Sequence, residues 1–327
     1  MPDTNTLTPI ETAVSRQRIY TLFSRLFLEG LTPELLDIAR HVPELAAAVP
    51  TPYHADEAAA SHYQLFQRNL YPYESFFLTT NGLLGGPIAG RVTAVYQQNH
   101  FTPPDTTTNP DHIGIELAFM AHLCKIEAQE LGIRDWKFTP PISAQRSFLQ
   151  THLLRWLPPL VLAIHRQANP FYTALADLML AFAAHDAQMR QCGGTETPHP
   201  HPPALLENDK TGLKEIARVL TTPCYTGMVI GRTEVTQLGQ KHRLPRGFGS
   251  RTQLMSNLLY TAVSYDTFPA LLQDILTLLE NSTAVYTQMA TDYPQLAHAV
   301  RPWQTQCQNS HQTIQQLLHR VCVEIEN

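Results

Sequence analysis

Hydrophobic residues recur every three or four positions along most of the chain, which is the period of an α-helix. The segment Thr8-Pro9-Ile10-Glu11 has the composition of a capping box with proline at the first helical position. After it, the apolar stripe Val14, Leu22, Phe23, Leu26 and Phe27 runs up to Gly30. No segment alternates apolar and polar residues as a half-buried strand does, and no repeat of fixed period occurs. The pattern therefore predicts an all-α fold, a helical bundle.

Prolines and glycines divide this pattern into segments. Thr32-Pro33 predicts the start of a second helix, Tyr71–Ser75 a break, and the glycine-rich stretch 82–87 a turn. Pro158-Pro159 predicts another interruption, because a proline inside a helix removes a hydrogen bond. Helices are expected in the intervening ranges, namely 55–69, 88–96, 109–131, 148–157, 169–189, 212–220, 233–242, 251–263, 269–289 and 294–324.

The stretch Cys192–Pro203, with the sequence CGGTETPHPHPP, cannot continue a helix. We therefore predict three regions. A main helical domain covers residues 1–192, a linker rich in Pro, Gly and His covers 193–204, and a C-terminal helical extension covers 205–327.

Composition narrows the class of protein. The 327 residues are 43% hydrophobic and 16% charged, with a net charge of −5, which argues against non-specific binding to nucleic acid or acidic lipid. No apolar run reaches the ~20 residues that span a bilayer, and the N-terminus lacks the basic and apolar regions of a secretory signal. The five cysteines are scattered without a Cys-x-x-Cys pair, which predicts reduced thiols in a cytoplasmic protein.

The segment Asn109–Leu117, NPDHIGIEL, carries Asp111, His112 and Glu116 at the predicted start of a helix, with Asn109 as the N-cap. These residue types suit catalysis or metal binding, but no His-Glu-x-x-His, Gly-x-Ser-x-Gly or phosphate-binding loop accompanies them. The only Glu-x-x-His, Glu196–His199, lies in the predicted linker. The spacing alone therefore favours a structural interpretation, since a carboxylate in the first turn complements the helix dipole.

Three ordered blocks give the chain a family resemblance over about residues 10–190. It resembles the TorD/DmsD/NarJ-type redox-enzyme maturation chaperones. The C-terminal region looks like an extension found in part of that family. The blocks are Tyr71–Phe77 followed by Gly85-Gly86, then Pro110-Asp111-His112 with Glu116, Leu117 and Met120, and lastly Phe148–Pro158 followed by Phe171-Tyr172.

The resemblance implies an all-helical cytoplasmic chaperone, not an enzyme, without a cofactor of its own. Such a protein binds the signal peptide, the apoprotein, or both, of a molybdopterin oxidoreductase catalytic subunit. It holds that subunit for cofactor insertion before assembly or twin-arginine export. Relatives exchange helices between chains, so a homodimer is also compatible with the resemblance.

By position, the resemblance makes Asp111 and His112 polar anchors of a signal-peptide groove. Carboxylates beside an apolar trough would suit the arginines of a leader, because arginine and carboxylate form paired charge-assisted hydrogen bonds. Some members carry Trp-Gly where this chain has Tyr73-Glu74. The expected site comprises Asp111, His112 and Glu116 on one side and Pro72, Tyr73, Glu74, Ser75 and Gly86 on the other.

Three further interpretations remain open from the residues. One is a helical nucleotide- or metal-dependent hydrolase that uses Asp111, His112 and Glu116. Another is a purely structural helical adaptor without a peptide groove. The third concerns the basic run Lys241–Arg251, which suits an acidic or phosphate-bearing partner, or else is a solvated loop between helices.

Overall fold

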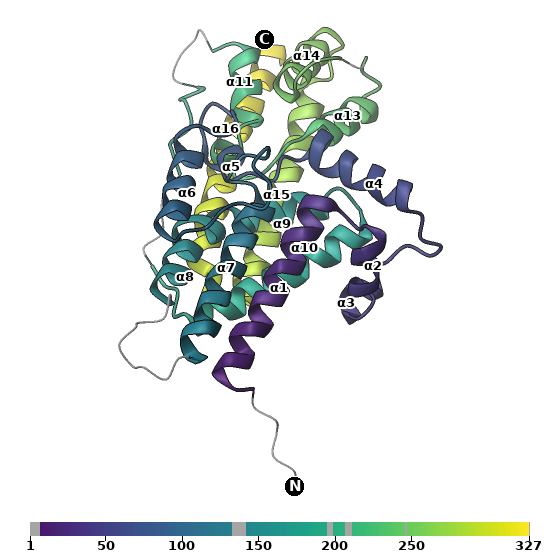
Figure 1. Cartoon of the computed structure of the whole chain (residues 1–327). Coiled ribbons are helices and arrows are strands. Elements are labelled where there is room, and N and C mark those ends of the chain that lie inside the picture. The colour runs from purple at the N-terminus through teal and green to yellow at the C-terminus, as the bar shows by residue number, and fades with distance from the viewer. Residues whose placement is uncertain (1–6, 133–141, 195–198, 207–210, 246, 327) are drawn as a thin grey trace.

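The computed structural model describes residues 7–132, 142–194, 199–206, 211–245 and 247–326. Within these ranges the chain is all-α, as predicted (Figure 1). The only β pairing among them is an isolated antiparallel bridge between Tyr73 and His112. Also within these ranges, no helix is both long enough and apolar enough to cross a bilayer.

The first part of the chain forms a bundle around two long, closely packed helices, α1 and α7, which Figure 1 shows side by side. Two short π-helical segments, η1 and η2, interrupt the regular α-helical pattern. In chain order the elements are α1 (Pro9–Glu29), α2 (Pro33–Ala39), α3 (Pro43–Ala46), α4 (Ala55–Tyr63), η1 (Gln64–Asn69), α5 (Glu74–Leu78), α6 (Gly86–Gln98), α7 (Ile113–Gly132), α8 (Ile142–Phe148), η2 (Leu149–Leu153), α9 (Leu154–His165) and α10 (Pro170–Met189).

The remaining elements belong to the predicted extension. Its two longest helices, α15 and α16, pack against each other. The elements are α11 (Leu213–Leu220), α12 (Pro223–Thr226), α13 (Arg232–Lys241), α14 (Arg251–Ser264), α15 (Phe268–Asp292), the 3₁₀ turn η3 (Pro294–Leu296) and α16 (Ala297–Glu326).

Local capping explains where several helices begin. The Thr8 side chain accepts a hydrogen bond from the Glu11 amide at 3.3 Å, and the Glu11 carboxylate accepts one from the Thr8 amide at 2.8 Å. Asn169 likewise accepts from the Tyr172 amide at 3.1 Å, directly before α10. These caps satisfy amides that have no partner within the helix, so the predicted helix starts are confirmed.

Three local predictions were wrong. The prolines Pro158 and Pro159 lie inside α9 and do not interrupt it. Pro159 cannot donate to the Arg155 carbonyl one turn earlier, and that carbonyl instead accepts from the Trp303 indole of α16 at 2.8 Å. The predicted break at 71–75 contains the start of α5, and α7 begins at Ile113 and not at Pro110.

A single small residue sets the close approach of α1 and α7. A Cβ atom built on Gly114 would lie 2.5 Å from Leu28 Cγ and 3.0 Å from the Ser24 carbonyl oxygen. Nearer the N-terminal end of α1, buried Arg16 forms ion pairs with Glu127 at 2.8 Å and with Asp186 at 2.7 Å. The arginine thus joins α1, α7 and α10, and its charge is compensated inside the bundle.

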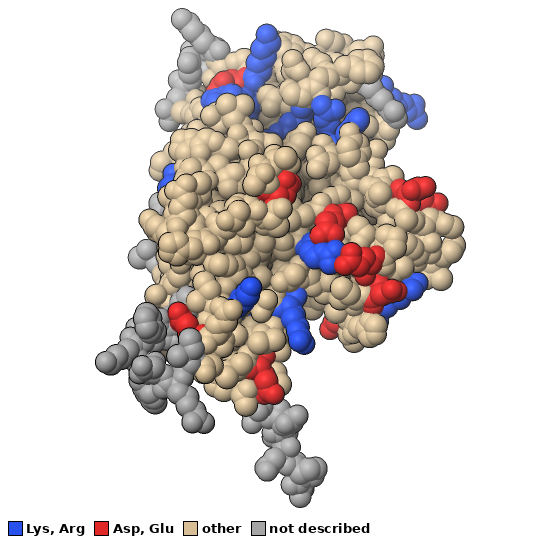
Figure 2. Space-filling view, viewed as in Figure 1, with Lys and Arg blue, Asp and Glu red and all other residues tan. Residues whose placement is uncertain are grey.

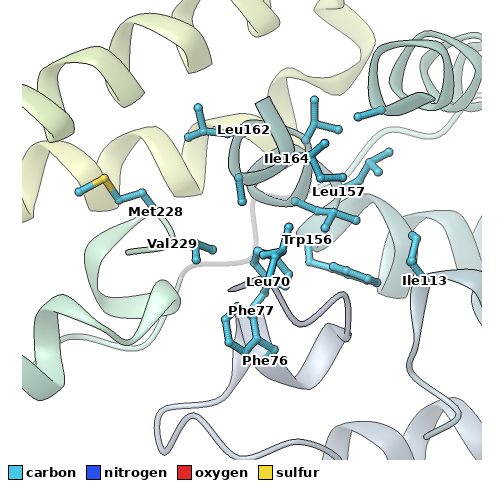
Figure 3. Close-up of a cluster of buried hydrophobic side chains, with 14 of the residues drawn as sticks. Leu70, Phe76, Phe77, Ile113, Trp156, Leu157, Leu162, Ile164, Met228 and Val229 are labelled. Atoms are coloured by element: carbon cyan, nitrogen blue, oxygen red, sulfur yellow. The ribbon is translucent and has the colours of Figure 1, made fainter. Parts of the chain in front are cut away.

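The C-terminal helices share a core with the first bundle (Figure 3). Trp303 of α16 donates a hydrogen bond to the Arg155 carbonyl of α9 at 2.8 Å. Arg166, just after α9, donates to the Val229 carbonyl and the Leu278 carbonyl, each at 3.2 Å. The domain boundary at residue 192 stays a prediction, while side chains on both sides of it pack together.

Candidate functional site

Two motif segments that lie far apart in the sequence meet at the Tyr73–His112 bridge. The Glu74 amide donates to the Asp111 carbonyl at 2.9 Å, and the Ile113 amide donates to the Pro72 carbonyl at 2.9 Å. The rings of Tyr73 and His112 contact each other edge to face, with centroids 4.9 Å apart. The first two motif blocks therefore form one continuous piece of structure.

Asp111 caps the short helix α5 from outside that helix. Its Oδ2 accepts a hydrogen bond from the Ser75 amide at 2.8 Å, in the first turn of α5. The Ser75 hydroxyl in turn accepts from the Gly85 amide at 2.8 Å. This chain of hydrogen bonds fixes the turn at residues 82–87 relative to the start of α7, because each buried amide has only one acceptor.

The third motif block completes the arrangement. His152 of η2 contacts Glu74 Oε2 through Nδ1 at 2.8 Å. Trp156 of α9 donates from Nε1 to Glu116 Oε2 at 3.3 Å. Sequence reasoning placed His152 and Trp156 in the family resemblance but gave them no role. Their contacts show that all three blocks share one buried network.

The acidic groups of this network are completely buried. Asp111, Glu116 and Glu74 each have an exposed fraction of 0%, and His112 has 5%. Burial raises the pKa of Glu116 well above its usual range, and the nearby charges of Glu74 and Asp111 add to the effect. The Glu116 carboxyl group therefore takes up a proton more readily than an exposed glutamate does.

His112 is the N-cap of α7. Its carbonyl accepts from the amides of Ile115 at 2.8 Å and Glu116 at 3.0 Å, and its ring Nδ1 accepts from the Gly114 amide at 3.0 Å. An Nδ1 acceptor requires the neutral imidazole with its proton on Nε2. Burial accordingly lowers the pKa of His112 to about 3, with a smaller contribution from His62.

The predicted groove residues thus divide into two groups. Asp111, His112, Glu116, Pro72, Glu74 and Ser75 are buried, so a peptide on the surface cannot reach them in this conformation. Tyr73 is half-buried and Gly86 is exposed.

The turn before Gly86 presents two exposed leucines, Leu83 at 66% and Leu84 at 39%. Phe76 and Phe77 of the first motif block lie in the core.

The same geometry removes the basis for a hydrolase. Asp111, His112 and Glu116 are each committed to a different partner: the Ser75 amide, the Gly114 amide and the Trp156 indole. Within the part of the chain that the structure describes, no group of three His, Cys, Asp or Glu side chains could hold a metal ion. Glu196 of the predicted linker lies outside the described residues.

Comparison with known proteins places similarity in the first part of the chain. The family model described as "Nitrate reductase delta subunit" matches residues 16–161. Chaperone protein TorD of Vibrio cholerae is 30% identical over 179 residues, which cover 52% of this chain and 80% of that protein. Chaperone protein TorD of Shewanella oneidensis is 27% identical over 209 residues, which cover 54% of this chain and 90% of that protein. No solved structure matches the chain at a significant level.

Proposed function

Because this chain belongs to the TorD family of chaperones, which are not enzymes, we propose that it is a maturation chaperone for a molybdopterin oxidoreductase. In this proposal it binds the apoprotein of the catalytic subunit in the cytoplasm, through the signal peptide, the mature part, or both. It holds the subunit until the cofactor is inserted and then releases it for assembly or export.

The observation that supports this function best is the single network built from the three motif blocks. It joins α5, η2, α7 and α9, and it fixes the turn 82–87 on the surface. A preorganised surface loses less conformational entropy when it binds a partner. The motif residues are then needed for the shape of the surface, although most of them never touch the partner.

We assign the contact surface to the residues of this region that reach solvent. Leu83 and Leu84 offer apolar side chains beside the half-buried ring of Tyr73. Exposed Gly86 and Pro87 begin α6, and the neighbouring surface over α6 and α7 carries few charged side chains (Figure 2). An apolar segment of a leader or of an unfinished subunit suits such a surface.

The remaining predicted site residues have a positioning role in this proposal. Asp111, Ser75 and His112 hold the turn and the start of α7, and Glu74 with Glu116 ties them to α9. A change at these positions would weaken partner binding by displacing the turn, without the loss of a direct contact.

Co-purification tests both the function and the surface. The tagged chain is co-expressed with a molybdopterin oxidoreductase catalytic subunit of the same genome, with and without its leader. We expect the wild type to recover the subunit, and Leu83→Ser/Leu84→Ser to recover at least tenfold less.

Ile38→Ser, which removes an exposed leucine-sized side chain from α2, is the matched control and should recover the subunit fully. Failure of the wild type to recover any such subunit would overturn the function. Equal recovery by the double variant would overturn only the surface.

A further inference from the structure

Arg251, the first residue of α14, extends from the C-terminal extension into the first motif block. Its Cζ lies 4.1 Å from the centre of the Phe76 ring. The Tyr71 ring packs on the same phenylalanine, with centroids 5.6 Å apart. A Cβ atom built on Gly82 would lie 3.4 Å from Arg251 Nη2. The guanidinium therefore lies between an aromatic segment and a turn that bears no side chain at Gly82.

The charge of Arg251 has no acidic partner in the part of the chain that the structure describes. Among the described residues, no carboxylate forms an ion pair with Arg251, and its Nη1 is buried without a hydrogen-bond partner. Burial lowers the pKa of its guanidinium to about 10. This contrasts with buried Arg16, which has two carboxylate partners. Arg251 is half-buried as a whole, but a buried guanidinium nitrogen without a hydrogen-bond partner is uncommon in folded proteins and calls for an explanation.

Arg251 lies where α5 packs against the C-terminal extension. Helix α5, which carries Phe76, is in contact with the extension at several points. The Cys224 thiol donates to the Thr79 carbonyl at 3.2 Å, and the rings of Phe77 and Trp303 pack edge to face with centroids 6.4 Å apart. These two contacts are neutral, whereas Arg251 brings a charged side chain to the interface.

The shape of the surroundings suits a guanidinium and not cations in general. A flat, delocalised and weakly hydrated cation stacks on an aromatic face, whereas a compact ammonium is strongly hydrated. Gly82 has a φ of +67°, a conformation that other residues adopt with strain, and it leaves room for the edge of the guanidinium. The segment before Arg251 includes Gly247 and Gly249, which allow the backbone to change direction there.

We infer that Tyr71, Phe76 and the turn at Gly82 form a guanidinium-binding site in the main bundle, which Arg251 fills in the free protein. An arginine side chain of a bound polypeptide takes the same site by displacing Arg251. The exchange with a partner's arginine rests on the proposed function, whereas the site filled by Arg251 does not. Arg251 of the extension thus competes with the bound polypeptide for this site and lowers the affinity of the chain for that polypeptide.

Chemical rescue tests the site without any partner. Arg251→Ala removes the guanidinium and leaves the space beside Phe76 open. We expect methylguanidinium to raise the thermal unfolding temperature of Arg251→Ala, while methylammonium at the same concentration does not. Wild type and Arg243→Ala, which removes an exposed arginine of the same basic run, should show no such difference. Equal responses of Arg251→Ala to the two cations would overturn the site.

Peptide competition tests the exchange. The probe is a fluorescent peptide with two adjacent arginines followed by leucines, compared with the same peptide carrying two lysines. We expect Arg251→Ala to bind the arginine peptide several-fold more tightly than wild type does, with little change for the lysine peptide. If the alanine variant does not fold, Arg251→Met replaces it, because methionine fills the space with an uncharged side chain. Arg251→Met should bind the arginine peptide no more tightly than the lysine peptide.

The outcomes separate the two proposals. Selective rescue by methylguanidinium without binding of either peptide would keep the site and remove its role in leader binding. Equal binding of the arginine peptide by wild type and Arg251→Ala would overturn the exchange, although the chaperone function would stand. If co-purification fails while rescue succeeds, the proposed function alone is wrong.

Discussion

Replacing Asp111 separates a positioning role from direct contact with a partner. Asp111 Oδ2 accepts from the Ser75 amide at 2.8 Å in a place without solvent exposure. Asp111→Ala leaves that buried amide without an acceptor. Asp111→Asn keeps an oxygen acceptor for the Ser75 amide and removes the buried carboxylate. The other carboxylate oxygen, Oδ1, has no hydrogen-bond partner among the described residues.

The expected magnitudes follow from these contacts. A hydrogen bond to a charged group contributes about 1.5–3 kcal/mol, and an unsatisfied buried donor costs about 1–3 kcal/mol. Because the two contributions overlap, Asp111→Ala should lower the free energy of unfolding by about 2–4 kcal/mol. Asp111→Asn should change it by less than about 1 kcal/mol, since the Ser75 amide keeps its partner.

Urea unfolding, followed by the circular dichroism of the helices, measures this difference. With a denaturant slope of about 3 kcal/mol per M, the midpoint of Asp111→Ala should fall by about 1 M. Partner recovery is measured in parallel at a urea concentration where every variant is folded. An alanine variant as stable as wild type would refute the capping role. An asparagine variant that is stable but recovers no partner would show that the carboxylate itself grips the partner.

Three further predictions address the buried groups and the interface with the extension. His112→Asn keeps an oxygen for the Gly114 amide and removes a base whose pKa falls from 6.5 to about 3. As the pH falls, the unfolded chain protonates this histidine before the folded chain does. The free energy of unfolding of wild type should therefore fall by about 1.4 kcal/mol per pH unit from pH 6.5 down to pH 3 because of this residue. Urea unfolding of His112→Asn should lack this contribution. Glu116, whose pKa is raised above 4.5, has the opposite sign: its contribution to stability falls as the pH rises above 4.5. The free energy of unfolding of Glu116→Gln, relative to that of wild type, should therefore be higher at pH 7 than at pH 4. The same relative value at both pH values would contradict the raised pKa of Glu116. Gly227→Ala would place Cβ 2.4 Å from the Cys307 amide nitrogen and 2.6 Å from the Trp303 carbonyl oxygen. Because both neighbours are backbone atoms, we expect a loss above about 3 kcal/mol in the same assay, and a loss below about 1 kcal/mol would contradict the packing of α12 on α16.

The helices that could be predicted from sequence are those with a local cap. Thr8 and Asn169 satisfy amides within three residues, so their own sequence segments determine where α1 and α10 begin. Helix α5 could not be predicted, because its cap comes from Asp111, which is 36 residues beyond Ser75 in the sequence. Pro158 and Pro159 lie inside α9, where the Arg155 carbonyl that Pro159 leaves free accepts from Trp303, so the partner comes from a distant part of the sequence and no local pattern indicates it.

The candidate site shows the same division. The resemblance placed Tyr73 and His112 on opposite sides of one groove, and the structure joins the two residues in a bridge. Their role in binding a partner stays a prediction. Their residue types could not predict burial, because an acidic residue near a helix start is usually exposed. The Glu74 carboxylate contacts His152 of η2 and the Asp111 carboxylate contacts the start of α5, and both contacts depend on how the whole bundle packs.

Calorimetric titration of the catalytic subunit into the chain tests the proposed role most directly. The subunit is prepared in two forms, without and with its molybdopterin cofactor. A chaperone that acts before cofactor insertion should bind the cofactor-free subunit at least tenfold more tightly than the loaded one. Equal affinity for both forms, or binding of neither, would contradict the role.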